Sequence, residues 1–279
     1  MRIARVTKDG KIGLAAKNGD AVTIAYGTEV ADLDAHIAAG TLAAAGAKAL
    51  AGEAVAETDL TFFPLATRPS KIICLGLNYR DHAEEAGLGI PEFPVLFARF
   101  PSSLIGHNAP IILPKVSEQL DWEAELVVVL SKGGKNIAEA DALNHVAGYS
   151  VFNDASIRDY QMKTPQWTAG KNFDDTGAIG PWLVTPDELP AGAAGLKIEC
   201  RLDGVVMQSS NTSNLIFDVA TTIHLLSTFM TLEAGDLLVM GTPGGVGIAR
   251  NPQVWMKAGQ ICEVEIEGVG LLVNPIVGE

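Results

Sequence analysis

Two carboxylates stand one residue apart at the start of an apolar run. Glu123 and Glu125 precede or open the segment 126–130, which reads Leu-Val-Val-Val-Leu. Residues two apart in a strand project to the same face, so both side chains would lie at the mouth of a buried strand. Close carboxylates repel each other and lose hydration there. A hard divalent cation such as Mg²⁺, Mn²⁺ or Ca²⁺ would offset this, and the alternative is a solvated strand edge.

A third carboxylate, Asp154, follows another apolar segment at 148–153 and precedes an expected helix. It would either cap that helix or point over the end of the sheet. Arg158 and Gln161 lie four and seven residues further on, so the pattern places them on one helical face with Asp154. A carboxylate, a guanidinium and an amide in a row would form a wall for an anionic substrate.

His82 and Glu85 are three residues apart in an expected short helix at 81–86, which Gly87 would close. A carboxylate beside an imidazole fixes its tautomer and raises its basicity, so the two residues are candidates for a general-base pair. The alternative is a chance charge pair on a surface helix.

Two further segments contain residues suited to binding anions. Lys171 lies between Gly170 and Asn172, where a lysine is usually exposed but would, beside a metal, stabilise an oxyanion. Thr242 lies in the glycine-rich loop 240–247, whose amides would bind a carboxylate. That loop is neither a P-loop nor a dinucleotide fingerprint. The three scattered cysteines argue against a disulfide framework and a thiolate metal site.

The elements that must position these residues are mostly strands. Residues 1–26 read as strands joined by hairpin turns at Asp9-Gly10 and Asn18-Gly19, and residues 28–54 show helical periodicity. A boundary falls near residue 67. Beyond it, short apolar segments predict strands, and helices are expected at 138–146 and 217–230. The pattern predicts a β-rich α+β fold on a rolled or barrel-like sheet.

Composition narrows the function classes. The 279 residues are 48% hydrophobic and 19% charged, with a formal net charge of −13. A globular fold is expected, and without a basic stripe nucleic acid is a poor partner. No apolar run approaches the roughly 18–20 residues that a membrane helix needs, and no signal segment opens the chain. We therefore expect a cytoplasmic protein in a reducing compartment.

Five motifs taken together resemble the fumarylacetoacetate hydrolase family. They are G-x-N-Y-x-x-H-x-x-E at 76–85, W-E-x-E-L at 122–126, N-D-x-x-x-R-D-x-Q at 153–161, G-K-x-F-D at 170–174 and G-T-P-x-G-V-G at 241–247. The resemblance implies a mixed β-roll catalytic domain at 67–279, a small N-terminal β-rich domain at 1–66, and a homodimer. Two positions depart from the family pattern, because Arg99 stands where Lys is frequent and Asn172 where Ser is frequent.

The resemblance also implies roles for individual residues. Glu123, Glu125 and Asp154 would bind Mg²⁺ or Mn²⁺, with Ca²⁺ possible. Water activation would fall to His82 and Glu85 on a mobile lid, and Lys171 would support the oxyanion. The substrate-binding residues would be Tyr79, Arg158, Gln161 and Thr242, with Gln161 also assisting Lys171.

The hypothesis is hydrolysis of a carbon–carbon bond in a diketo acid such as an acylpyruvate or fumarylpyruvate, as in the catabolism of aromatic compounds. The alternative on the same site is isomerisation or decarboxylation of an unsaturated 2-hydroxy or 2-keto dicarboxylate, or of oxaloacetate. A non-catalytic metabolite-binding protein is an alternative of another class, since a fold alone does not prove activity.

Overall fold

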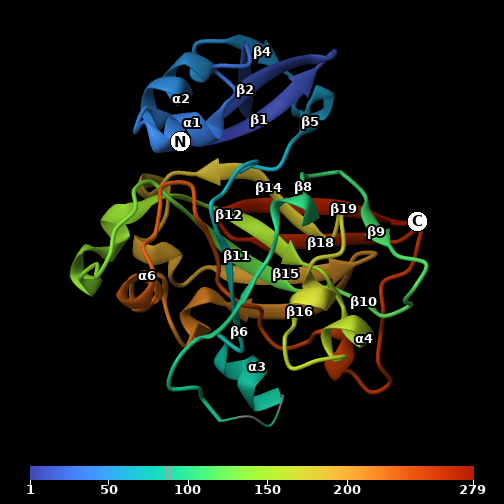
Figure 1. The fold of residues 1–279 in the computed structure, drawn as a ribbon. Coiled ribbons are helices and arrows are strands. Elements are labelled where there is room, and N and C mark those ends of the chain that lie inside the picture. The colour runs from blue at the N-terminus through green and yellow to red at the C-terminus, as the bar shows by residue number, and fades with distance from the viewer. Residues whose placement is uncertain (86, 88) are drawn as a thin grey trace.

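The computed structural model describes residues 1–85, 87 and 89–279. The N-terminal part forms a small β-rich unit at the top of Figure 1. Its elements are β1 (Arg2–Lys8), β2 (Lys11–Asn18), β3 (Ala21–Tyr26), α1 (Leu33–Ala38), α2 (Leu42–Leu50), β4 (Glu53–Val55), η1 (Glu57–Asp59) and β5 (Thr61–Phe62). Both expected hairpin turns are present, with Gly10 and Gly19 at positive φ, which glycine adopts without steric cost.

The larger part contains most of the strands and the short helices that surround them (Figure 1). The strands are β6 (Ile72–Gly76), β7 (Val95–Ala98), β8 (Leu104–Ile105), β9 (Ile111–Leu113), β10 (Leu120–Asp121), β11 (Ala124–Leu130), β12 (Val146–Asp154), β13 (Ser156–Ile157), β14 (Gly177–Val184), β15 (Lys197–Leu202), β16 (Val205–Asn211), β17 (Leu237–Val239), β18 (Ile261–Ile266) and β19 (Gly270–Gly278). The helices are α3 (Arg80–Glu85), α4 (Arg158–Gln161), α5 (Thr168–Lys171) and α6 (Val219–Phe229), with 3₁₀ turns η2 (Pro101–Ser103), η3 (Glu139–His145), η4 (Pro186–Glu188), η5 (Ala191–Ala193), η6 (Thr212–Asn214) and η7 (Gly247–Ala249).

One long sheet runs through both parts, in the order β4-β3-β2-β1-β14-β12-β11-β17-β6-β7. Because β1 pairs with β14, the N-terminal unit extends the main sheet. Whether 1–66 and 67–279 are independent domains stays a prediction. A second sheet, β16-β15-β18-β19-β9, packs through β18 and β19 on β12. Strands β11 and β12 are buried along their whole length between these layers, so polar side chains at their ends are held in dry surroundings.

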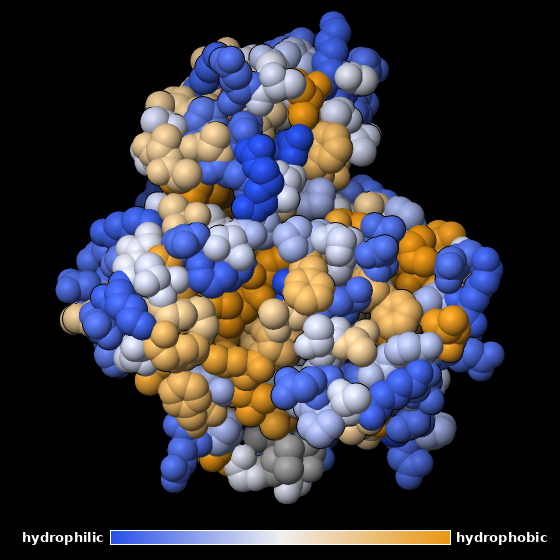
Figure 2. All heavy atoms as spheres, in the orientation of Figure 1, coloured by the Kyte–Doolittle hydropathy of each residue, from blue (hydrophilic) through white to orange (hydrophobic). Residues whose placement is uncertain are grey.

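The observed elements confirm a β-rich α+β fold of mixed strand direction, with differences in detail. The expected helix at 138–146 is the 3₁₀ helix η3, which has no side-chain cap at Ala138. The helix at 81–86 corresponds to α3, and Ala86 lies outside the described residues. In the described part of the chain, no helix is both long and apolar enough to cross a bilayer. Figure 2 shows a mostly hydrophilic surface with apolar side chains gathered in the middle of the visible face.

Candidate metal centre and substrate pocket

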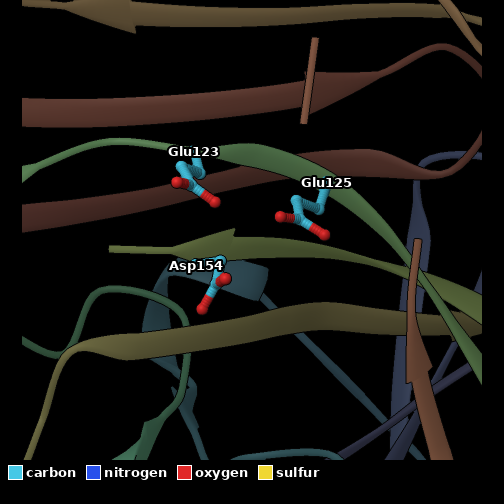
Figure 3. A group of neighbouring side chains, drawn as sticks. All are labelled: Glu123, Glu125 and Asp154. Atoms are coloured by element: carbon cyan, nitrogen blue, oxygen red, sulfur yellow. The ribbon is translucent and has the colours of Figure 1, made fainter. Parts of the chain in front are cut away.

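Strands β11 and β12 bring the three carboxylates together (Figure 3). Glu123 immediately precedes β11, Glu125 lies within it, and Asp154 ends the neighbouring β12. One oxygen from each lies within 4.8 Å of the others, and all three side chains are buried. The backbone amide of Asp154 donates to the Glu123 carbonyl at 3.0 Å, which fixes the two strand ends side by side. The carboxylates therefore lie in the interior and not at a solvated strand edge.

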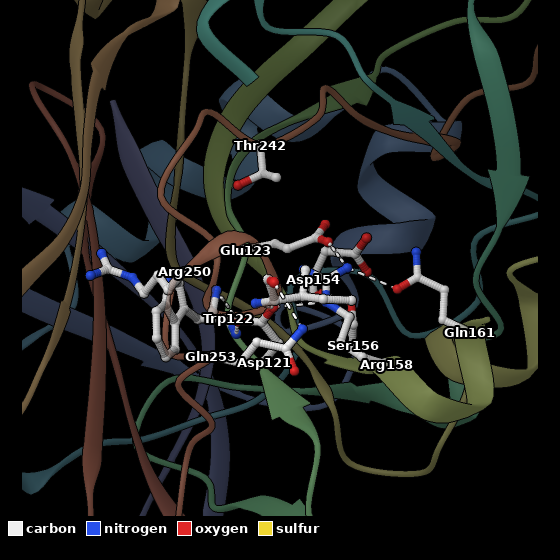
Figure 4. Close-up of polar contacts among 12 residues, drawn as sticks. Asp121, Trp122, Glu123, Asp154, Ser156, Arg158, Gln161, Thr242, Arg250 and Gln253 are labelled. Carbon is white, nitrogen blue, oxygen red and sulfur yellow. Dashed lines mark hydrogen bonds and ion pairs between the residues drawn. The ribbon is translucent and has the colours of Figure 1, made fainter. Parts of the chain in front are cut away.

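Asp154 does not cap a helix, contrary to one of the two expectations for it. It remains in the sheet, paired with Gly177 of β14, and β13 separates it from α4, whose N-cap residue is Ile157. The idea that Asp154 shares a helical face with Arg158 and Gln161 is therefore wrong. Those two residues do share one, because Arg158 Nη1 donates to Gln161 Oε1 at 2.8 Å (Figure 4).

The three carboxylates differ in the buried cations that they contact. Lys171 is 1% exposed, and its Nζ donates to Glu123 Oε2 at 2.8 Å and to Asp154 Oδ2 at 2.6 Å. Arg158 Nη1 lies 2.7 Å from Glu123 Oε1 (Figure 4). Glu125 has no such ion pair among the described residues and accepts the backbone N–H of Gly241 at 2.5 Å. Glu125 therefore carries the least compensated charge of the three.

The electrostatics of the two glutamates differ accordingly. Burial opposes ionisation of Glu123, but Lys171 and Arg158 outweigh it and lower its pKa to about 2. Burial, together with the charges of Asp154 and Glu123, raises the pKa of Glu125 well above its ordinary value. Burial also opposes the charged form of Lys171, yet the carboxylates of Asp154 and Glu123 raise its pKa, so it remains an ammonium ion.

These residues fit a hard divalent cation. All three candidate ligands offer carboxylate oxygen, the ligand type that Mg²⁺, Mn²⁺ and Ca²⁺ prefer. The unfavourable ionisation of Glu125 is what a neighbouring dication would relieve, because an opposite charge stabilises the ionised form. Among the described residues the candidate ligand group contains no cysteine, and Cys74, Cys200 and Cys262 are all buried.

A cavity of about 250 Å³ opens beside the cluster. Its walls are largely apolar, and its polar groups come from the residues singled out in the sequence. The lining residues are Leu75, Gly76, Leu77, His82, Phe97, Glu123, Arg158, Gln161, Met162, Trp167, Lys171, Thr242, Val246 and Ile248. A larger cavity of about 510 Å³ beside Arg2 and Lys197 contains none of the carboxylates, so chemistry and not size identifies the site. A largely apolar pocket whose lining includes the cations Arg158 and Lys171 suits a small anion.

The two residues of the expected general-base pair lie close together beside the cavity. His82 Nδ1 lies 3.4 Å from Glu85 Oε2, and His82 lines the cavity. Both carboxylate oxygens of Glu85 accept the N–H of Gly245 at 3.1 Å, so α3 is docked on the glycine-rich loop. Of the two ring nitrogens of His82, Nδ1 therefore faces Glu85 and Nε2 does not.

The other expected substrate-binding residues are placed differently. Thr242 lines the cavity, and its hydroxyl accepts Gln208 Nε2 at 2.8 Å. Tyr79 is fully buried outside the cavity lining, and its hydroxyl has no hydrogen-bond partner within the described residues. Its role in substrate binding stays a prediction.

Several buried polar residues that position the site were not singled out. Asp121 accepts Arg158 Nε at 2.8 Å and the N–H of Gly247 at 2.7 Å, so it joins α4 to the loop (Figure 4). Gln208 accepts the N–H of Ala124 at 2.9 Å and thereby holds the start of β11. The strand period of two that places Glu123 and Glu125 on one face also includes Asp121, so the sequence pattern could have identified that residue.

The fold is a mixed β-roll, and its buried cluster of three carboxylates offers oxygen ligands suited to a divalent cation. The fumarylacetoacetate (FAA) hydrolase C-terminal model matches residues 71–277. The chain belongs to the fumarylacetoacetate hydrolase family, as the five motifs indicate.

Individual relatives have different activities. The chain is 44% identical over 224 residues to the mitochondrial oxaloacetate tautomerase Fahd2a of Rattus norvegicus, covering 80% of this chain and 71% of that protein. The fumarylacetoacetate hydrolase of Exiguobacterium antarcticum superimposes with a TM-score of 0.85 at 30% identity, covering 100% of both chains. The 5-carboxymethyl-2-hydroxymuconate delta-isomerase of Mycobacterium smegmatis superimposes with a TM-score of 0.80 at 29% identity, covering 100% of this chain and 99% of that one.

Proposed function

We propose that this chain is a divalent-metal-dependent tautomerase that interconverts the keto and enol forms of a small 2-oxo acid such as oxaloacetate. The 44% identity to an oxaloacetate tautomerase over 80% of the chain carries this proposal. It replaces hydrolysis as the first choice, and hydrolysis of an acylpyruvate-like diketo acid becomes the second. The contact between His82 and Glu85 at the cavity favours that second candidate, because such a pair can activate water.

The proposed metal is Mg²⁺ or Mn²⁺, with Ca²⁺ as a further possibility, held by Glu123, Glu125 and Asp154. Such an ion would supply Lewis-acid stabilisation of negative charge on an enolate oxygen. The donor set favours hard cations without choosing among them.

The remaining chemistry comes from the chain itself. Arg158 is buried, lines the cavity, and within the described residues its Nη2 has no hydrogen-bond partner. We assign that nitrogen to a substrate carboxylate, which accepts charge-assisted hydrogen bonds from guanidinium. His82 Nε2 takes the proton from the carbon beside the keto group, and Glu85 steadies the resulting imidazolium through Nδ1. A proton returned to the oxygen gives the enol, so no atom is gained or lost.

The decisive experiment follows oxaloacetate and an acylpyruvate by enol absorbance and by product mass. Each assay is run in EDTA and again after Mg²⁺ or Mn²⁺ is restored, with the spontaneous keto–enol exchange subtracted. Metal-dependent exchange of oxaloacetate with no change of mass supports the proposal. Cleavage of acylpyruvate with uptake of water would favour the hydrolase, and loss of CO₂ from oxaloacetate would favour a decarboxylase. Binding without turnover in any assay would favour the metabolite-binding alternative.

We also propose a homodimer, which light scattering during gel filtration would test. Aromatic side chains exposed in the larger part, among them Phe93, Phe100 and Phe229, offer apolar surface for such an interface. A cytoplasmic location is likewise a proposal, since the Rattus norvegicus relative is described as mitochondrial. Fractionation of the source cells would decide between the two compartments.

A further inference from the structure

Arg99 is a buried guanidinium that contacts a candidate metal ligand directly. It is 2% exposed and follows β7. Its Nη1 donates to Asp154 Oδ1 and, at 3.2 Å, to the carbonyl of Ala155. Nη2 donates to Thr176 Oγ1 at 2.6 Å and Nε to Ser103 Oγ at 3.2 Å. All three guanidinium nitrogens are therefore occupied, and the plane of the group is fixed.

Asp154 is consequently held from two sides. Arg99 occupies Oδ1, while Lys171 occupies Oδ2 at 2.6 Å and also reaches Glu123 Oε2 at 2.8 Å. Because Lys171 joins Oδ2 to Glu123, Oδ2 is the oxygen turned toward the carboxylate cluster. The guanidinium on the opposite oxygen prevents the carboxylate from rotating. Arg99 thus sets which oxygen Asp154 presents to the cluster.

The backbone leaves room for this guanidinium at Gly177, the residue paired with Asp154 across β12 and β14. A Cβ at Gly177 would lie 3.0 Å from Arg99 Nη2 and 3.1 Å from its Cζ and Nε. Such distances require the guanidinium to shift by a few tenths of an ångström. The close approach of Gly177 is therefore part of the site that holds Arg99.

Asn172 fixes the backbone on both sides of Arg99. Its Oδ1 accepts the N–H of Phe100 at 2.6 Å, and its Nδ2 donates to the carbonyls of Ala98 at 3.0 Å and Thr168 at 2.9 Å. Asn172 also directly follows Lys171, at the end of α5. One amide side chain therefore ties the segment that carries Arg99 to the helix that carries Lys171. A serine at this position could not form all three contacts, because it has one hydroxyl in place of separate donor and acceptor atoms.

We propose that Arg99 and Asn172 act together as a positioning unit that orients Asp154 as a metal ligand. At both positions the sequence departs from the pattern that the family resemblance implies, which has Lys and Ser there. Lysine would keep the charge but lose the planar fork that reaches Thr176 and Ser103. The inference rests on the metal centre of the proposed function and adds the residues that define its geometry.

The test measures Mn²⁺ affinity by electron paramagnetic resonance in the full chain, with folding checked by thermal denaturation. The variants are Arg99→Lys, Asn172→Ser and their combination. Arg201→Lys is the control, because Arg201, like Arg99, forms ion pairs with carboxylates but lies on β15 outside the cluster. Partners that orient metal ligands are worth about 10–100-fold in affinity. We expect Arg99→Lys to weaken Mn²⁺ binding at least about tenfold and Asn172→Ser to weaken it less.

The combined variant distinguishes a unit from two separate residues. If Asn172 acts through Arg99, the double variant should bind Mn²⁺ about as well as Arg99→Lys alone, because coupled residues are not additive. If the fold losses of Mn²⁺ affinity in the two single variants multiply in the double variant, the two residues act separately and the positioning unit is refuted. Wild-type affinity in Arg99→Lys, with only a lower melting temperature, would show a purely structural ion pair and overturn the inference.

Should Arg99→Lys fail to fold, Gly177→Ala makes the same test by displacing the guanidinium. Weaker Mn²⁺ binding in folded Gly177→Ala supports the inference, and unchanged binding contradicts it. Absence of Mn²⁺ binding in the unaltered chain would overturn the metal centre itself, whereas loss of the expected difference between variants would overturn only the positioning role.

Discussion

Replacing Lys171 with Met would remove a buried ammonium that contacts both Glu123 and Asp154. Methionine keeps a side chain of similar length, so the change removes charge more than volume. The two carboxylates would remain in a dry site with one counter-ion fewer. Since Lys171 is 1% exposed, water cannot replace its hydrogen bonds without rearrangement.

The magnitude follows from the cost of leaving a buried charge unpaired. Removing one partner of a buried ion pair destabilises a protein by about 3–5 kcal/mol. For a chain of this size, 1 kcal/mol changes the melting temperature by about 2 °C. We therefore expect Lys171→Met to melt roughly 6–10 °C below the wild type in EDTA. Lys197→Met is the control, because that lysine is 61% exposed and its ion pair with Glu199 should contribute little.

Added metal should affect the variant more strongly than the wild type. A dication would offset the negative charge of the same carboxylates, and in Lys171→Met it would not be repelled by a neighbouring ammonium. Mg²⁺ or Mn²⁺ should therefore raise the melting temperature of Lys171→Met more than that of the wild type. Turnover should stay about 10²–10³-fold lower even when metal restores stability, if Lys171 also stabilises developing negative charge. The assay pairs thermal denaturation with enol absorbance at fixed metal concentration. A variant within 2 °C (about 1 kcal/mol) of wild type in EDTA would refute the charge argument.

Three other changes test separate parts of the structure. Glu125→Gln removes a charge that burial and neighbouring carboxylates oppose, so the stability of the metal-free protein in urea should not fall. Its Mn²⁺ affinity should drop at least about tenfold, and unchanged affinity would exclude Glu125 as a ligand. Burial lowers the pKa of His107, whose Nδ1 accepts a backbone N–H. The unfolded state thus binds more protons near and below about pH 6.5, and stability should fall as pH drops through that range. His107→Asn should flatten that dependence, and an equal slope in the variant would contradict the assignment. Glu85→Gln keeps an acceptor for Gly245 but removes the charge beside His82, so kcat should fall about 10²–10⁴-fold with Mn²⁺ affinity unchanged; full activity would exclude the pair as the base.

The sequence predicted those elements that residues adjacent along the chain specify by themselves. The turns at Gly10 and Gly19 follow from adjacent Asp-Gly and Asn-Gly pairs, and β11 and β12 from continuous apolar runs. The sequence indicated a strand only at Val184 of β14 and none at β19, because Pro181 and Pro275 interrupt the strand pattern. The pairing of β1 with β14 joins residues far apart along the chain, and no periodicity within either strand specifies it.

The site residues likewise divide into those that sequence spacing predicts and those that only the pairing of distant strands brings together. Period two places Glu123 and Glu125 on one face, and helical spacing joins His82 to Glu85. Asp154 was found, but its neighbours were misjudged because the chain stays in the sheet for longer than its composition indicated. The contacts of Arg99 and Gln208 depend on register between distant strands, so sequence spacing contains no signal for them.

The alternative reactions share most of these residues, so the geometry of the site alone does not choose between proton transfer and water activation. Both keto–enol exchange and diketone cleavage develop negative charge on an enolate oxygen, beside which Lys171 and Arg158 are already held by buried ion pairs. Exchange needs in addition only a base within reach, for which His82 at the cavity wall is the candidate. Cleavage needs the same base to hold a water molecule in line with a second carbonyl, and therefore a longer substrate. We therefore propose that the substrate length that the apolar walls at Phe97 and Trp167 accept separates the two reactions, since the acidic cluster itself does not distinguish them.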